Sequence, residues 1–322
     1  KLPPPSPLYP ALDPFKTHML PVGQGHVLYV AEYGNPQGLP AVVLHGGPGS
    51  GFSPNAPRRF NPATYRVICF DQRGAGKSTP TGSIQHNTTQ HLVADVEVLR
   101  THLKIENWLV YGTSWGSTLG LAYAQAYPKR VNALVLGGIF MATKEELDWF
   151  SSPHGAMRLY PNQIRELKLL LGNPHPSRFF EALHSTINGP DKQKAQAAAR
   201  QWSLVECLLA VPTPSMAEIE AELASPSMLP RAQIEISYIA QGCYLKPDQL
   251  LKNAHRLRQI PLTIIQGQLD FVTPPAAAHA LHAALPHSQL LLIPTAGHVG
   301  NEDMEKARLQ TLNTHATQAK SL

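Results

Sequence analysis

The chain has 322 residues, of which 43% are hydrophobic and 15% charged, an ordinary globular composition that excludes a disordered chain. The formal net charge is +5, but Lys and Arg are scattered without a basic run, which argues against nucleic acid or a membrane surface as a partner. The three cysteines, Cys69, Cys207 and Cys243, lie far apart without CxxC spacing, so they encode neither a disulfide framework nor a zinc site.

The segment 1–15 is rich in proline and predicts an extended arm, because each proline fixes φ and removes a backbone donor. It lacks the charged-then-apolar pattern of a signal peptide, and no apolar run in the chain is long enough to span a membrane. Unpaired cysteines favour a reducing compartment. Together these features predict a soluble cytoplasmic protein.

Residues 26–38 alternate between apolar and polar and end in turn residues, which is typical of an antiparallel edge strand. Helical patterns separate the apolar runs that follow, and for the pattern at 88–103 the expected N-cap is Thr88 or Thr89. The apolar runs predict buried parallel strands at 41–46, 65–71, 107–112 and 132–138. Strands that alternate with helices predict an α/β fold with a mostly parallel sheet.

From about residue 140 the pattern changes to helical segments broken by prolines, and strand character returns at 261–270 and 289–298. We therefore predict an α/β core made of residues 1–139 and 259–322. A helical cap of residues 140–258 is expected as an insertion into this core.

Residues 112–116 read GTSWG, a GxSxG pattern with an apolar run before it and a helical pattern after it. In this context the serine is expected on a strained strand-to-helix turn, where a Cβ on either glycine would clash. Ser114 is therefore a candidate nucleophile. The alternative is a polar residue at an ordinary bend.

A nucleophilic serine needs a general base, and the base needs an orienting acid. In hydrolases with this turn, the order along the chain is Ser, then Asp or Glu, then His, each after a later strand. Asp270 and His298 meet this requirement; the alternatives are a helix-capping aspartate and one of 15 histidines in a polar loop. Three other histidines lie in or beside the intervening helix and are disfavoured: His279, His282 and His287.

The segment 45–51, HGGPGSG, follows the first buried strand and offers flexible backbone near the expected nucleophile. The negative oxygen that develops in acyl transfer needs two preorganised N–H donors, which we assign to Trp115 and Gly47. A tight glycine turn without a ligand is the alternative. No HExxH or other metal-ligand spacing occurs, so we expect no metal and no cofactor.

These motifs resemble, in the same order, those of the proline iminopeptidases, which are prolyl aminopeptidases of the α/β-hydrolase superfamily. The resemblance spans nearly the whole chain and includes HGGPG at 45–49, DQRGAGKSTP at 71–80, GTSWGS at 112–117, GGIF at 137–140 and QIE at 233–235. It implies the α/β-hydrolase fold. It also implies a serine exopeptidase that releases an N-terminal proline from short peptides through a prolyl-enzyme intermediate.

Such a substrate carries a free, positively charged imino group, and a buried cation needs paired carboxylates. By resemblance the two glutamates that bind this group are Glu206 and Glu235, although each residue alone is also compatible with a solvated helix face. The proline ring needs an apolar slot. By resemblance Phe140 and Phe150 line it with Trp149 nearby; the alternative is that these aromatic residues only pack the cap on the core.

Four positions depart from the family pattern. Gly137 stands where arginine is usual, the segment at Ser151 differs from the common one, Val205 replaces a tryptophan, and Thr273 replaces a cysteine. We expect the first three in or beside the pocket, where they bear on substrate breadth. The threonine predicts weak sensitivity to thiol reagents.

Two other functions fit the same residues. A carboxylesterase or acyltransferase would use the same triad without needing the glutamates. A non-catalytic binding protein would retain only the fold, but no catalytic position is missing. Dehalogenases and epoxide hydrolases are disfavoured because their nucleophile is an aspartate where this chain has Ser114.

Overall fold

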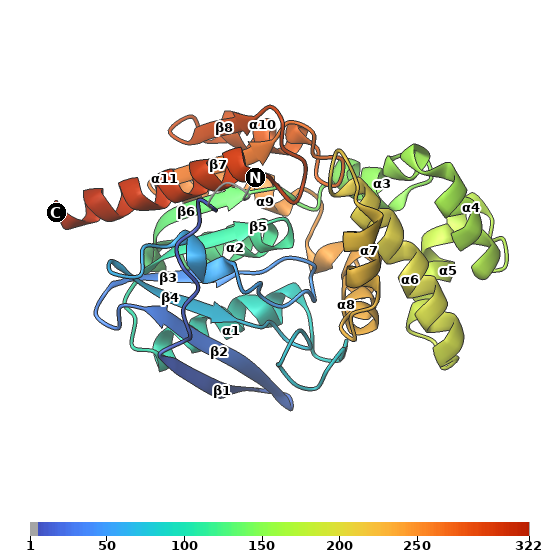
Figure 1. Ribbon diagram of the computed structural model, residues 1–322, viewed down its shortest axis with the longest axis horizontal. Coiled ribbons are helices and arrows are strands. Elements are labelled where there is room, and N and C mark those ends of the chain that lie inside the picture. The colour runs from blue at the N-terminus through green and yellow to red at the C-terminus, as the bar shows by residue number, and fades with distance from the viewer. Residues whose placement is uncertain (1–5, 322) are drawn as a thin grey trace, which may run out of the picture.

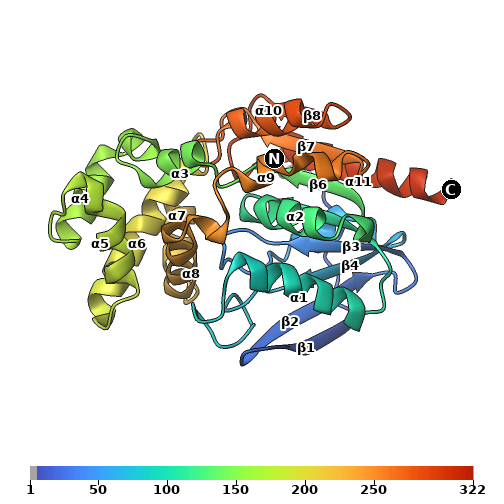
Figure 2. The same ribbon diagram turned by 180° about the vertical axis from the view of Figure 1, so that it is seen from behind.

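The computed structural model describes residues 6–321 and contains an eight-stranded sheet with helices on both faces (Figures 1 and 2). The strand order is β1-β2-β4-β3-β5-β6-β7-β8, with antiparallel pairing of β1 with β2 and β2 with β4 and parallel pairing elsewhere. The predicted α/β fold with a mostly parallel sheet is confirmed. The strands are β1 Lys16–Gly23, β2 His26–Gly34, β3 Leu39–Leu44, β4 Tyr65–Phe70, β5 Trp108–Thr113, β6 Val131–Gly137, β7 Leu262–Gly267 and β8 Gln289–Ile293.

The prediction for the sheet edge was wrong by one strand. β2 is the second strand of the sheet, and the edge is formed by β1, which the sequence did not indicate. In β1 only Leu20 is buried, so the strand has no apolar alternation to reveal it. The expected extended arm falls partly on residues 1–5, outside the described part of the chain; residues 6–15 form neither helix nor strand.

Alternate residues along the strands build two separate cores, as the two-residue period of a strand requires. One core packs the sheet against α1, α2, α9 and α10, and the other packs the opposite face against α11. Figure 2 shows α1 and α2 in front of the sheet, whereas α11 crosses the front in Figure 1. These helices are α1 Thr89–His102, α2 Trp115–Ala126, α9 Gln249–Lys252, α10 Pro275–Ala284 and α11 Glu302–Lys320.

The helix α1 begins as predicted, since the Thr88 side chain accepts a hydrogen bond from the His91 amide at 3.3 Å. This cap satisfies one of the free donors at the start of the helix.

Of the seven α-helices that lie between β6 and β7 in the sequence, α9 packs on the sheet and the other six gather beyond one end of it (Figures 1 and 2). They pack around their own apolar core, in which Trp202, Phe179 and Leu183 are buried. The division of the chain into a core and a cap at residues 140 and 258 stays a prediction. The helices are α3 Lys144–Ser151, α4 Pro161–Leu170, α5 Phe179–Ile187, α6 Lys192–Leu209, α7 Met216–Leu223 and α8 Met228–Ala240.

Across residues 6–321, none of the helices combines the length and the apolar character that crossing a membrane requires.

Candidate active site

Ser114 occupies the tight turn between β5 and α2. Its φ of +57° and ψ of −125° lie in a sparsely populated region for a residue with a side chain, at a cost of about 1–3 kcal/mol. A Cβ on Gly112 would lie 2.3 Å from the carbonyl oxygen of Gly116, and one on Gly116 would lie 2.1 Å from that of Leu44. Both glycines are therefore required by close backbone approach, as the sequence predicted.

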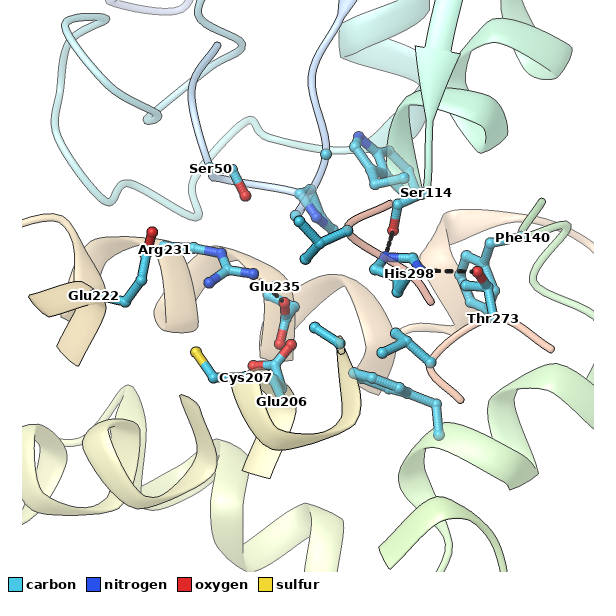
Figure 3. Close-up of a pocket in the computed structure, with 18 of the residues that line it drawn as sticks. Ser50, Ser114, Phe140, Glu206, Cys207, Glu222, Arg231, Glu235, Thr273 and His298 are labelled. Carbon is cyan, nitrogen blue, oxygen red and sulfur yellow. Dashed lines mark hydrogen bonds and ion pairs between the residues drawn. The ribbon is translucent and has the colours of Figure 1, made fainter. Parts of the chain in front are cut away.

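His298 lies between Ser114 and Asp270. The three residues come from three different segments at the carboxyl edge of the sheet. His298 Nε2 is 3.0 Å from Ser114 Oγ (Figure 3), and its Nδ1 is 2.8 Å from Asp270 Oδ2. Because a carboxylate only accepts, the proton belongs on Nδ1 and Nε2 is left to accept from the serine hydroxyl. This is the geometry that a serine nucleophile and its base need.

Asp270 is buried and its orientation is determined by its own loop. Its Oδ1 accepts hydrogen bonds from the backbone amides of Val272 and Thr273, at 3.0 and 2.8 Å. The Thr273 hydroxyl donates to Asp270 Oδ2 at 3.0 Å and lies 3.1 Å from His298 Nδ1. Thr273 thus touches both partners of the base, a role that sequence reasoning missed because it treated this position only as a departure from the family.

The segment 45–51 runs past the nucleophile, and its first residue is held by a buried network. His45 Nε2 accepts from the Gln72 amide at 2.9 Å, and the Gln72 side chain accepts from the Trp115 indole N–H at 2.9 Å. Burial lowers the pKa of His45, which keeps the imidazole neutral and able to accept. The network couples this loop, which contains Gly47, to the start of α2, which contains Trp115; these are the two proposed oxyanion donors.

Gly47 and Trp115 both line the cavity that contains Ser114. Gly47 has a φ of +114°, and a Cβ there would lie 2.5 Å from the amide nitrogen of Gly49. Within the described residues, neither backbone amide donates a hydrogen bond to the protein. Their role as oxyanion donors stays a prediction.

Glu206 of α6 and Glu235 of α8 line the same cavity, and Figure 3 shows their carboxylates pointing toward one another. The Trp202 indole donates to Glu235 Oε1 at 2.8 Å, and Arg231 Nη2 lies 3.9 Å from Glu235 Oε2. Burial, together with the neighbouring Glu235 carboxylate, raises the pKa of Glu206 well above its usual range. The two groups therefore form one coupled acidic pair.

The aromatic prediction needs one correction. Phe140 and Phe150 line the cavity, and Phe150 meets Trp202 edge to face with ring centres 5.4 Å apart. Trp149 does not line it, because its indole N–H donates to the carbonyl of Phe271 at 2.8 Å, in the loop after Asp270. Its contact is thus with the loop rather than with a bound ring.

Three of the family departures were expected in or beside the pocket, and none of the three lines the cavity. A Cβ on Gly137 would lie 2.3 Å from the carbonyl oxygen of Ile265, Val205 is buried in the helical core, and the Ser151 hydroxyl donates to the Leu147 carbonyl. Thr273 is the only one of the four departures that reaches the cavity.

The cavity has a volume of about 690 Å³ and combines polar and apolar walls. Arg231 and Cys207 also line it, although sequence reasoning singled out neither as a site residue. The α6–α7 connection closes one side: the Val299 amide, next to His298, donates to the carbonyl of Ala210 at 3.1 Å. The cavity thus brings together Ser114, His298, Gly47, Trp115, Glu206, Glu235, Phe140 and Phe150.

The other candidate histidines face elsewhere. His282 bonds Ser288 and His287 bonds the carbonyl of Ile260, and none of the three, His279 included, lines the cavity. Over residues 6–321, no group of three or more His, Cys, Asp or Glu side chains is placed to hold a metal ion.

Comparison with known proteins agrees with this architecture. Residues 40–304 match the family model described as alpha/beta hydrolase fold. The chain therefore belongs to the α/β-hydrolase family.

Two similar proteins narrow the family assignment. The chain is 42% identical over 308 residues to a proline iminopeptidase of Arabidopsis thaliana, covering 95% of this chain and 81% of that protein. It is 39% identical over 292 residues to a proline iminopeptidase of Neisseria meningitidis serogroup B, covering 90% and 93%. Within the α/β hydrolases, the chain belongs to the proline iminopeptidase family.

Solved structures share the fold at low identity. An esterase from Exiguobacterium antarcticum superposes with a TM-score of 0.64 at 19% identity, covering 91% of this chain and 96% of the esterase. A proline iminopeptidase-related protein from Thermus thermophilus superposes with a TM-score of 0.63 at 21% identity, covering 92% and 97%. At these identities the likeness concerns the fold alone.

Proposed function

We propose that this protein is a serine exopeptidase that releases an N-terminal proline from short peptides. The observation that carries the proposal is the pair Glu206 and Glu235 in the same cavity as Ser114 and His298. A free prolyl N-terminus is a cation, and its burial is favourable only beside carboxylates. An esterase for neutral acyl groups would have no cationic substrate group to place beside these two carboxylates.

In the first half of the reaction, the substrate's imino group binds Glu206 and Glu235 and its ring lies against Phe140 and Phe150. Ser114 Oγ attacks the prolyl carbonyl carbon while His298 Nε2 takes the hydroxyl proton. The carbonyl electron pair moves to the oxygen, which the amides of Gly47 and Trp115 stabilise by about 3 kcal/mol for each donor.

The tetrahedral intermediate then collapses. The bond to the leaving nitrogen breaks as His298 Nε2 donates its proton to that nitrogen, and the shortened peptide departs. Water attacks the prolyl-enzyme ester, its proton goes to His298, and Ser114 Oγ leaves with that proton. Proline is released and the site returns to its starting state.

Asp270 holds the imidazole in the tautomer with the proton on Nδ1 and stabilises its charged form. The buried position of Asp270 and its two backbone donors support this role, because they limit the orientations that the carboxylate can adopt. All three cysteines are free, which supports a location in the reducing cytoplasm.

The test compares L-proline 4-nitroanilide, its N-acetylated form and 4-nitrophenyl acetate, for wild type and Ser114→Ala. We expect rapid hydrolysis of the free-imino substrate by wild type only, because acetylation removes the cation that the glutamates bind. Retained turnover by Ser114→Ala would exclude this serine as the nucleophile.

The same substrates separate the alternative functions. Fast hydrolysis of the ester with no hydrolysis of the prolyl anilide would identify an esterase and remove the role of the glutamates. Failure of a serine-directed phosphonate to label wild type would favour a non-catalytic binding protein.

A further inference from the structure

Arg231 brings a positive charge into an otherwise acidic cavity. It lies one helical turn before Glu235 on α8, and Figure 3 shows its guanidinium pointing toward Glu235. Its Nε is buried without a hydrogen-bond partner among the described residues. Of the described residues that line the cavity, it is the only Lys or Arg. The proposed mechanism does not use this side chain.

The carboxylate pair needs such a charge. Two carboxylates that share a desolvated site repel each other, so one of them keeps a proton unless a cation is close. A protonated carboxylic acid offers no charge to an incoming imino cation. The two-glutamate site would then bind its substrate with one negative charge instead of two.

We infer that Arg231 is the resident counterion of the Glu206–Glu235 pair, whose positive charge favours ionisation of both carboxylates when the substrate's imino cation enters the site. The inference rests on the proposed prolyl aminopeptidase activity. Two carboxylates and one guanidinium leave a net charge of −1, which one imino cation neutralises. The occupied site is thus balanced, and a buried site favours that state.

The geometry fits a supporting cation better than a competing one. Arg231 Nη2 lies 3.9 Å from Glu235 Oε2, beyond hydrogen-bond distance, so the carboxylate oxygens keep lone pairs for a ligand. Glu235 Oε1 is held separately by Trp202. A tight bidentate pair between Arg231 and Glu235 would instead have occupied the site that the substrate needs.

The remaining charged and titratable groups around the pair strengthen the requirement. Two further carboxylates of α7 line the cavity and add negative charge, whereas burial raises the pKa of the Cys207 thiol to about 11 and keeps it neutral. Arg231 opposes the rise in the pKa of Glu206 that burial and Glu235 cause. The other titratable groups that line the cavity are Cys207 of α6, Glu218 and Glu222 of α7, Cys243 after α8 and His298 after β8.

The test compares Arg231→Met, which removes the charge, with Arg231→Lys, which keeps it. Arg200→Met is the matched control, because Arg200 belongs to α6, pairs with Glu220 at 2.6 Å and does not line the cavity. For each variant, kcat and KM for L-proline 4-nitroanilide are measured against pH, with 4-nitrophenyl acetate as a second substrate and the unfolding midpoint as the check on folding.

We expect Arg231→Met to raise KM for the prolyl substrate by about tenfold or more and to lower the ratio of prolyl to ester kcat/KM. The acidic limb of its pH profile is expected at higher pH. Without the guanidinium the pKa of Glu206 rises further, so both carboxylates are ionised only at a higher pH. Arg231→Lys and Arg200→Met are expected to keep the wild-type limb.

Three results would overturn the inference. The first is a pH profile of Arg231→Met whose acidic limb is unchanged. The second is a fall in the KM of Arg231→Met, which would mark Arg231 as a competitor of the substrate, and the third is a rise in KM in Arg231→Lys as large as in Arg231→Met. If Arg231→Met does not fold, Arg231→Gln takes its place with the same expectations. A wild type that cuts the ester but not the prolyl anilide refutes the proposed function instead, independently of any Arg231 variant.

Discussion

Replacing Glu235 by Gln removes one negative charge from the cavity while keeping the size of the side chain. The amide oxygen of Gln can still accept the hydrogen bond that Trp202 donates at 2.8 Å, so the local packing around α8 is preserved. The variant therefore tests charge and not shape.

The expected loss follows from the position of the carboxylate. Glu235 is 2% exposed, so water screens its interaction with a bound imino cation only weakly. Removing one partner of such a buried charge pair costs about 3 kcal/mol, which corresponds to a fall of about 150-fold in kcat/KM for L-proline 4-nitroanilide. Hydrolysis of 4-nitrophenyl acetate, which carries no amine, should change by less than about threefold.

The measurement is the ratio of the two kcat/KM values for wild type, Glu235→Gln and Glu222→Gln. Glu222 lines the same cavity from α7, so its variant removes the same charge without touching the Glu206–Glu235 pair. A similar loss in both variants would mean that only the overall charge of the cavity matters. Parallel losses on the two substrates in Glu235→Gln would refute recognition of the amine by this residue.

Thr273→Val should lower kcat by about tenfold on both substrates, because Asp270 loses a hydroxyl donor, and Thr273→Ser should restore it; an unchanged kcat in the valine variant would contradict the positioning role. The raised pKa of Glu206 means that the folded state holds this proton more tightly than the unfolded chain, so wild-type stability is lost as pH rises through that pKa. The difference in unfolding midpoint between Glu206→Gln and wild type should therefore shift in favour of the variant as pH rises above the ordinary carboxyl range, and a difference independent of pH would contradict the raised pKa. Because burial raises the pKa of Cys207 to about 11, only about one thiol in ten thousand is ionised at neutral pH, and iodoacetamide should inactivate the enzyme slowly; rapid inactivation abolished by Cys207→Ser would oppose this.

Local patterns predicted the parts of the fold in which burial follows the period of the element. The buried strands β3 to β7 are continuous apolar runs, and their positions agree with the structure to within a few residues. β1 lacked such a signal because its pairing partner covers one edge while both of its faces stay largely exposed. An edge strand of this kind is held mainly by backbone pairing, and its amino-acid sequence therefore gives little signal for a strand.

The candidate site shows the same limit. Ser114, Asp270 and His298 could be predicted because the turn and the chain order are properties of the sequence. Arg231 could not, since a basic residue on a helix normally faces water, and only the packing of α8 against α6 turns it toward the carboxylates. Trp149 was placed near the pocket by resemblance to the family, which does not show that neighbours on a helix, here Trp149 and Phe150, point in different directions.

The hydrogen bond from the Val299 amide to the Ala210 carbonyl has an evolutionary consequence. The residues proposed to bind the substrate's amine come from helices between β6 and β7, whereas the residues proposed to break the bond come from loops of the sheet, so relatives could in principle exchange one part without the other. The joint between Ala210 and the residue after His298 constrains such exchange, and a Cβ on Gly297 would already lie 2.8 Å from Pro212. A chimera that replaces residues 140–258 without preserving this joint would misplace the general base, so new specificities are reached more readily by point substitution inside the cavity than by recombination.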